Sequence, residues 1–174
     1  MVAMRPNPSH ERLNVLVSEA EQPWAEQLPR LLEPQGVRAI RAASVRDAMV
    51  VLDAGPVHLA VIDSALPLER DEPRPPRVSE RYQRRHRQPG ALKLMQVLRR
   101  LDPVPPTVII RGRMFDPRVD DRLLADALSL DVFSVLDQPV QLEQLLGVLR
   151  RMMERYYGGR WPSGRAADSD SPDQ

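Results

Sequence analysis

The sequence predicts an α/β protein in which a parallel β-sheet is covered by helices on both faces. Short apolar runs alternate along the chain with segments whose apolar residues recur at helical spacing. The run 59–62 is apolar throughout and ends on Asp63, as expected of a strand buried on both faces. With 174 residues, of which 42% are hydrophobic, the chain is long enough to bury one core.

The predicted strands and helices alternate five times along the chain. Strands are expected at residues 13–18, 37–42, 57–63, 107–110 and 132–136. Helices with an apolar stripe are expected around residues 24–32, 45–52, 90–101, 119–130 and 142–153. Strands and helices that alternate in this way form parallel sheets with right-handed crossovers.

Three residues affect the ends or the course of the first two helices. Ser44 is expected to cap the second helix, because a serine hydroxyl can accept from a free backbone N–H of the first turn. Gly36 is expected to end the segment that contains the first helix. Pro29 lies inside that helix and removes one backbone hydrogen bond, so a kink or a late helix start is expected.

We expect one domain, at residues 12–157, with two tails and one insertion. Residues 1–11 are polar and are predicted to be a flexible tail. Residues 158–174 are rich in Gly, Ser, Asp and Pro and are predicted to be disordered. Residues 68–89 hold seven arginines and four acidic residues, besides prolines, and exceed an ordinary connection, so they are predicted to form an inserted loop.

The composition excludes several classes of function. Lys and Arg (25) nearly balance Asp and Glu (24), so a formal net charge of +1 gives no global attraction to nucleic acid or anionic lipid. The absence of cysteine excludes disulfides, thiolate catalysis and sulfur-based zinc sites. The sequence contains no apolar run of about eighteen residues, so no membrane span is expected and a cytoplasmic location is predicted.

Asp63 is the main candidate for a functional residue. It ends the third predicted strand, and Leu66 and Pro67 close the turn that follows. Open α/β sheets keep their functional sites at the carboxyl ends of their strands, where this carboxylate is expected. A strand that delivers one carboxylate to that edge therefore points to a site there.

The chain resembles the response regulator receiver domain, the phospho-accepting module of two-component signalling. The resemblance rests on five βα repeats, on the turn Asp63-Ser64-Ala65-Leu66-Pro67 and on Gln138-Pro139 after the fifth strand. It spans about residues 13–156. It implies a flavodoxin-like (βα)5 fold, a doubly wound parallel sheet with strand order 2-1-3-4-5.

The resemblance also assigns positions in the site. Asp63 matches the phospho-acceptor, and Glu19 and Ala20 match the acidic pair after the first strand. Glu19, Asp63 and the backbone carbonyl of Ala65 are the implied ligands of Mg²⁺. The family's hydroxyl, aromatic and lysine positions are Arg111, Val135 and Gln138, and Pro139 is a candidate for a cis peptide bond.

These positions depart from the family pattern in ways that affect its chemistry. Ala20 removes the family's direct metal ligand, and Mg²⁺ requires near-ideal octahedral oxygen geometry, so weakened metal binding and no cofactor are expected. Phosphoryl transfer depends on positioning and on neutralising charge, and Gln138 has lost the family's lysine charge. Arg111 restores one charge, and we hypothesise that it pairs with Asp63, unless it turns into solvent.

The sequence therefore predicts a non-enzymatic, stand-alone receiver-like module that binds proteins without being phosphorylated. Its partner, or a second copy, is expected to bind the face of the fourth helix, fifth strand and fifth helix. This face ends in Arg150, Arg151, Met152 and Tyr156 on the last helix. The alternative is that Met152 and Met153 are core residues.

Two other functions stay open. The first is a genuine phospho-acceptor, with Asp63 phosphorylated by a histidine kinase. The second is nucleic-acid association through residues 81–87, where arginines surround Tyr82, although an arginine-rich solvated loop explains this segment more simply.

Overall fold

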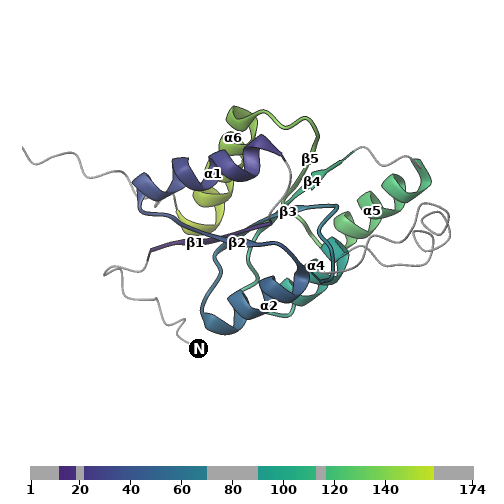
Figure 1. Cartoon of the computed structure of the whole chain (residues 1–174), viewed down its shortest axis with the longest axis horizontal. Coiled ribbons are helices and arrows are strands. Elements are labelled where there is room, and N and C mark those ends of the chain that lie inside the picture. The colour runs from purple at the N-terminus through teal and green to yellow at the C-terminus, as the bar shows by residue number, and fades with distance from the viewer. Residues whose placement is uncertain (1–11, 19–21, 70–89, 113–116, 159–174) are drawn as a thin grey trace, which may run out of the picture.

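The computed structural model describes residues 12–18, 22–69, 90–112 and 117–158, and contains one parallel sheet (Figure 1). Its strand order is β2-β1-β3-β4-β5, with parallel neighbours throughout. The strands are β1 (Asn14–Ser18), β2 (Arg38–Ala42), β3 (Leu59–Asp63), β4 (Thr107–Arg111) and β5 (Ser134–Asp137). The predicted fold class and strand order are confirmed. Strands β3 and β5 begin two residues later than predicted.

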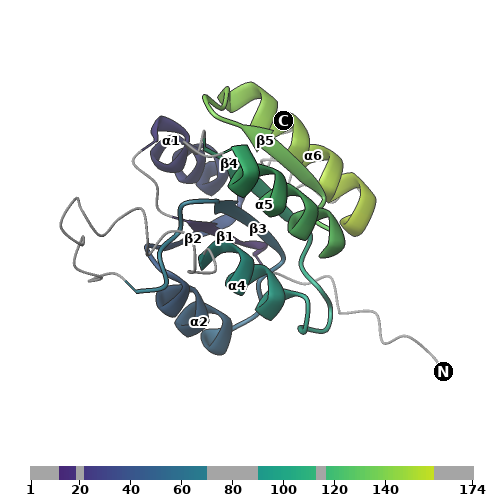
Figure 2. The same ribbon diagram turned by 90° about the vertical axis from the view of Figure 1, so that its right-hand side faces the viewer.

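Helices cover both faces of this sheet. On one face lie α1 (Pro23–Leu32) and α6 (Leu142–Tyr157) (Figures 1 and 2). On the other face lie α2 (Val45–Ala54), α4 (Gly90–Leu98) and α5 (Pro117–Ser129) (Figure 2). Helix α4 ends three residues before the predicted end, and the turns that follow it lead into β4.

Strand β3 lies at the centre of the sheet and divides the apolar interior into two cores. Leu59 and Val61 pack with α1 and α6, whereas Ala60 and Ile62 pack with α2, α4 and α5. All four side chains are at most 1% exposed. Complete burial of a large aliphatic side chain contributes about 1.5–3 kcal/mol, so both faces of β3 must be apolar. Its continuous apolar run follows from this position.

The predicted signals at the helix ends are largely confirmed. Ser44 Oγ accepts from the backbone N of Asp47 at 3.1 Å, and Asp47 Oδ2 accepts in return from Ala43 N. Gly36 has φ 80° and ends the short 3₁₀ helix η1 (Glu33–Gln35) that follows α1. The late start of α1 predicted from Pro29 is wrong. The helix begins at Pro23, and a proline in the first turn removes no hydrogen bond because the N–H groups there have no partner within the helix.

The turn after β3 is fixed against two helices. The backbone N–H groups of Val45 and Arg46, at the start of α2, donate to the carbonyls of Pro67 and Leu68. At the start of α4, Gly90 lies so close to Leu66 that a Cβ atom would be 2.2 Å from its carbonyl oxygen. The residues that follow Asp63 are therefore held in one path.

The last residue of α6 is attached to the amino end of β3. The hydroxyl of Tyr157 donates to the carbonyl of His58 at 2.7 Å, and the two rings meet edge-on. Nδ1 of His58 in turn accepts from the backbone N of Asn14 in β1. The predicted tail 1–11, residues 159–174 of the predicted tail 158–174 and residues 70–89 of the predicted insertion lie outside the described residues.

Candidate functional site

Asp63 lies where the sequence places it, at the carboxyl edge of the sheet. It is the last residue of β3, pairs with Ile110 of β4 and is only 4% exposed. Its backbone N donates to Ser18 Oγ at 2.6 Å, which ties the ends of β1 and β3 together. The register of the parallel sheet thus delivers one buried carboxylate to this edge.

Two neutral donors contact the carboxylate of Asp63. The backbone N of Ala65 donates to Oδ1 at 2.8 Å, and Nε2 of Gln138 donates to Oδ2 at 2.9 Å. Burial raises the pKa of Asp63, and these two hydrogen bonds partly oppose that rise. The side chain at the family's lysine position therefore reaches the carboxylate, but it brings no charge.

Gln138 is held in place by its own backbone. Its N–H donates to the carbonyl of Arg111 at 2.8 Å, which continues the pairing of β4 and β5 beyond the end of β5. The peptide bond between Gln138 and Pro139 is cis, as predicted. A Cβ atom on Gly112 would lie 3.3 Å from Oε1 of Gln138, so the side chain at residue 138 occupies space that glycine leaves.

Arg111 has a different partner from the one expected. Its Nε donates to Oδ1 of Asp137 at 2.5 Å, and the two residues are register partners on β4 and β5. The structure therefore corrects the proposed pairing of Arg111 with Asp63. A guanidinium on the last residue of β4 meets the adjacent carboxylate on β5, whereas Asp63 is contacted by the uncharged amide of Gln138.

The predicted Mg²⁺ ligands are covered only in part by the described residues. Glu19 and Ala20 lie outside them, while Asp63 and Ala65 lie together on the turn. Within the described ranges, no group of three or more His, Cys, Asp or Glu side chains is placed to hold a metal ion. Each oxygen of Asp63 accepts one hydrogen bond and keeps a further lone pair, so metal binding by Glu19, Asp63 and Ala65 stays a prediction.

Val135, at the family's aromatic position, is a packing residue. It is partly buried, pairs with Ile109 across β4 and β5, and packs against the core beneath α2, α4 and α5. Its side chain is aliphatic and contributes no hydrogen-bonding group at this position.

Of the four residues on the predicted interaction face of α6, three are exposed, and binding through this face stays a prediction. Arg150 and Arg151 are exposed, and Tyr156 is 49% exposed. Met152 is fully buried in the core beneath α1 and α6, so its placement on this face is wrong. A shift of one position along a helix turns a side chain by about 100°, which separates exposed Arg151 from buried Met152.

Three residues of the site were not identified from the sequence. Ser18 Oγ accepts from Asp63 N, and Ser64 Oγ accepts from Gly112 N at 3.1 Å, so both hydroxyls hold backbone groups at the strand ends. Asp137 engages Arg111. Their only signal in the sequence is that each lies at or beside the end of a predicted strand. Residues 81–87, the candidate nucleic-acid segment, lie outside the described residues.

Solved structures of receiver domains share this fold. A response regulator receiver protein from Pseudomonas putida matches with TM-score 0.59 and 21% identity, over 82% of this chain and 98% of its own. The receiver domain of an HD domain-containing protein from Pseudomonas fluorescens Pf-5 matches with TM-score 0.63 and 20% identity, over 85% and 99%. The corresponding domain of AraT from Geobacillus stearothermophilus matches with TM-score 0.62 and 16% identity, over 85% and 98%.

Comparisons with family models and with curated proteins found no match. Among the described residues, no helix has the length and apolar character needed to span a bilayer. The chain thus has the fold of response regulator receiver domains, at a sequence identity that leaves its function to be argued from its own residues.

Proposed function

We propose that this chain is a receiver-type, non-enzymatic cytoplasmic module of two-component-type signalling, which binds a protein partner without phosphorylation of Asp63. The observation that supports this most is the environment of Asp63. Among the described residues, the side chain that donates to its carboxylate is the neutral amide of Gln138, while Arg111 donates to Asp137. The receiver fold is retained, but the charges that phosphoryl transfer needs are arranged differently.

The chemistry of phosphoryl transfer gives the physical reason. The transferred group carries negative charge on three equatorial oxygens, so acceptor sites work by placing cations around it. Asp63 is nearly buried, and burial raises its pKa because the charged form is poorly solvated. A second negative group at this position would require compensation that an amide cannot supply. We therefore expect acceptance of a phosphoryl group to be strongly disfavoured.

We propose that the partner, or a second copy of the chain, binds the face formed by α5, β5 and α6. Leu128 on α5 is 62% exposed, and Tyr156 on α6 is 49% exposed. The ring of Tyr156 packs edge-on against Phe133, and the guanidinium carbon of Arg155 lies 5.8 Å from the ring centroid of Tyr156. Aromatic and arginine side chains that are partly held in place are typical anchors of protein interfaces.

Mass spectrometry of the intact protein tests the first part of this proposal. The chain is incubated with Mg²⁺ and acetyl phosphate, beside Asp63→Asn and beside a receiver domain that accepts phosphate. We expect neither wild type nor Asp63→Asn to gain mass relative to its own untreated sample. A gain of one phosphoryl group in wild type that is absent from Asp63→Asn would instead establish Asp63 as a phospho-acceptor, as the alternative function requires.

A further inference from the structure

The ends of β3, β4 and β5 are joined by hydrogen bonds that continue beyond the last residues of the strands. Ser64 N donates to the carbonyl of Ile110 at 2.9 Å, and Gly112 N donates to Ser64 Oγ at 3.1 Å. On the other side of β4, Gln138 N donates to the carbonyl of Arg111. These contacts form a continuous set of bonds across three neighbouring strands at the edge that carries Asp63.

The side chain of Gln138 spans this edge. Strands β3 and β5 are not neighbours, because β4 lies between them, yet Nε2 of Gln138 donates to Oδ2 of Asp63. The side chain must therefore cross the end of β4, where Gly112 follows the last strand residue. Since a Cβ on Gly112 would come within 3.3 Å of Oε1, a glycine there leaves space for the crossing amide.

The same residue lies just before α6. Only three residues separate Gln138 from Leu142, the first residue of that helix, and Val140 among them packs against the core beneath α1 and α6. The backbone of Gln141 accepts from Leu145 N in the first turn. The position of Gln138 therefore constrains how the chain enters α6, one side of the proposed interaction face.

We propose that Gln138 is a positioning residue, which holds Asp63 across the Gly112 gap and thereby fixes the junction between β5 and α6. This inference rests on the proposed function, because it explains how the α5, β5 and α6 face could be set in one arrangement without a phosphoryl group or metal ion. Gly112 supports Gln138 by leaving space for its amide, and Ser64 holds Gly112 through its hydroxyl.

Amide hydrogen exchange followed by mass spectrometry, without Mg²⁺ or phosphoryl donor, tests this role. Gln138→Met keeps the length of the side chain but removes the donor, and Gln138→Lys restores a donor to Asp63. We expect exchange of residues 139–149 to be about tenfold faster in Gln138→Met, since a buried charged acceptor loses a partner. We expect Gln138→Lys to return the rate to within about twofold of wild type.

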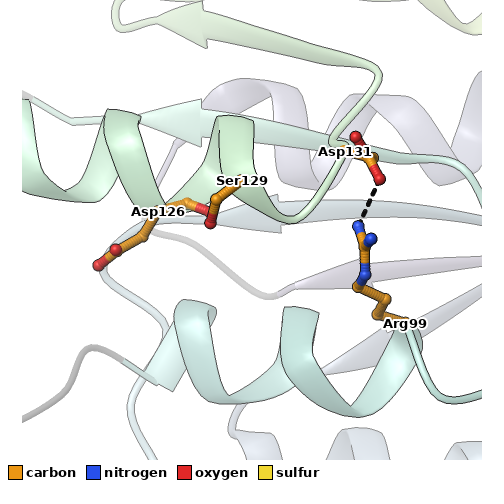
Figure 3. Close-up of polar contacts among 4 residues, drawn as sticks. All are labelled: Arg99, Asp126, Ser129 and Asp131. Atoms are coloured by element: carbon orange, nitrogen blue, oxygen red, sulfur yellow. Dashed lines mark hydrogen bonds and ion pairs between the residues drawn. The ribbon is translucent and has the colours of Figure 1, made fainter.

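A matched control lies at the opposite end of β5. Asp131 precedes that strand and accepts from Nη1 of Arg99 at 2.6 Å, between exposed side chains (Figure 3). Asn tolerates the φ of 54° at Asp131, so Asp131→Asn removes this ion pair without backbone strain. We expect it to leave exchange of residues 139–149 unchanged.

Gly112→Ala provides a second variant in case Gln138→Met does not fold. It should accelerate exchange in the same residues, because the new Cβ would lie 3.3 Å from Oε1 of Gln138 and the amide must shift away from it. Unchanged exchange in Gln138→Met, no recovery in Gln138→Lys, or equal acceleration in Asp131→Asn would each overturn the inference. Phosphorylation of wild type by acetyl phosphate would contradict the proposed function, whereas these rates, measured without a phosphoryl donor, test the positioning role of Gln138 separately.

Discussion

At the scale of single residues, Asp63 is a carboxylate whose burial disfavours its ionised form. Asp63 is nearly buried, and from the described part of the chain its carboxylate accepts one backbone and one side-chain hydrogen bond, both from neutral groups. Burial raises its pKa more than these bonds lower it. Keeping Asp63 ionised therefore opposes folding, as is common when a group is retained for its position in a site.

The stability of the protein should depend on pH in a direction set by Asp63. Because its pKa is raised above 3.8, the folded state binds more protons than the unfolded state just above that value. The unfolding free energy should consequently fall as pH rises through this window. Asp63→Asn should remove that fall and raise stability at pH 7 by about 1 kcal/mol, with the Gln138 amide turned to present its oxygen.

Urea denaturation between pH 4 and 7 measures this effect. The control is Asp53→Asn on the exposed surface of α2, which should leave the pH dependence unchanged. If Asp63→Asn were as pH-dependent as wild type, or less stable at pH 7, burial of the Asp63 charge would not be the dominant effect at this position.

At the scale of elements, the start of α4 depends on a close approach of backbones. Gly90 touches the turn after β3 so closely that any side chain would collide with the carbonyl of Leu66. That turn is also held by the first residues of α2. The two helices and the turn therefore have to move together, which makes residue 90 a sensitive position.

A pair of glycine substitutions tests this packing. In Gly90→Ala the Cβ would lie 2.2 Å from a backbone oxygen, so we expect a loss of about 2 kcal/mol or more. In Gly147→Ala, inside α6, the Cβ meets nothing within 4 Å, and the better helix propensity should add about 0.5–1 kcal/mol.

Thermal and urea unfolding of the two variants provide the measurement. Each variant adds one methyl group to a helix of the same domain, so Gly147→Ala is the control for the chemical change itself. A Gly90→Ala protein as stable as wild type would show that α4 can shift away from the turn at little cost.

At the scale of the whole molecule, one apolar core lies on each side of the sheet. Helix α5, strand β5 and helix α6 lie together at one side of the fold (Figure 2). Strand β5 is an edge strand of the described sheet. Leu128 and Tyr156 are exposed on the helices that flank it. An apolar surface beside a strand edge is a common site of protein association.

If this face binds a second copy, substitutions there should change the oligomeric state. Leu128→Asp together with Tyr156→Asp should shift a self-associating sample to monomer, because burying two carboxylates in an apolar contact is costly. The control is Leu31→Asp on α1, another exposed leucine, at 38% exposure. Analytical ultracentrifugation measures the effect. Equal loss of association in the control would place the interface elsewhere.

The fold could be predicted from the sequence because it depends on local periodicity and burial. Apolar runs, helical stripes, the Ser44 cap and Gly36 each act over a few residues, and together they determined the succession of strands and helices along the chain. The strand order within the sheet followed from the resemblance to receiver domains. The location of Asp63 followed as well, since a residue that ends a central strand must lie at the sheet edge.

Side-chain partners within the site depended on tertiary structure. Gln138 and Asp63 are separated by 75 residues, and their contact needs the ends of β3, β4 and β5 in exact register. Whether Arg111 meets Asp63 or Asp137 depends on which carboxylate its side chain faces at the end of β4. The sequence by itself thus determined the fold and the place of the acidic residue, while tertiary structure decided its partners and buried Met152, because such contacts depend on side-chain direction between distant segments.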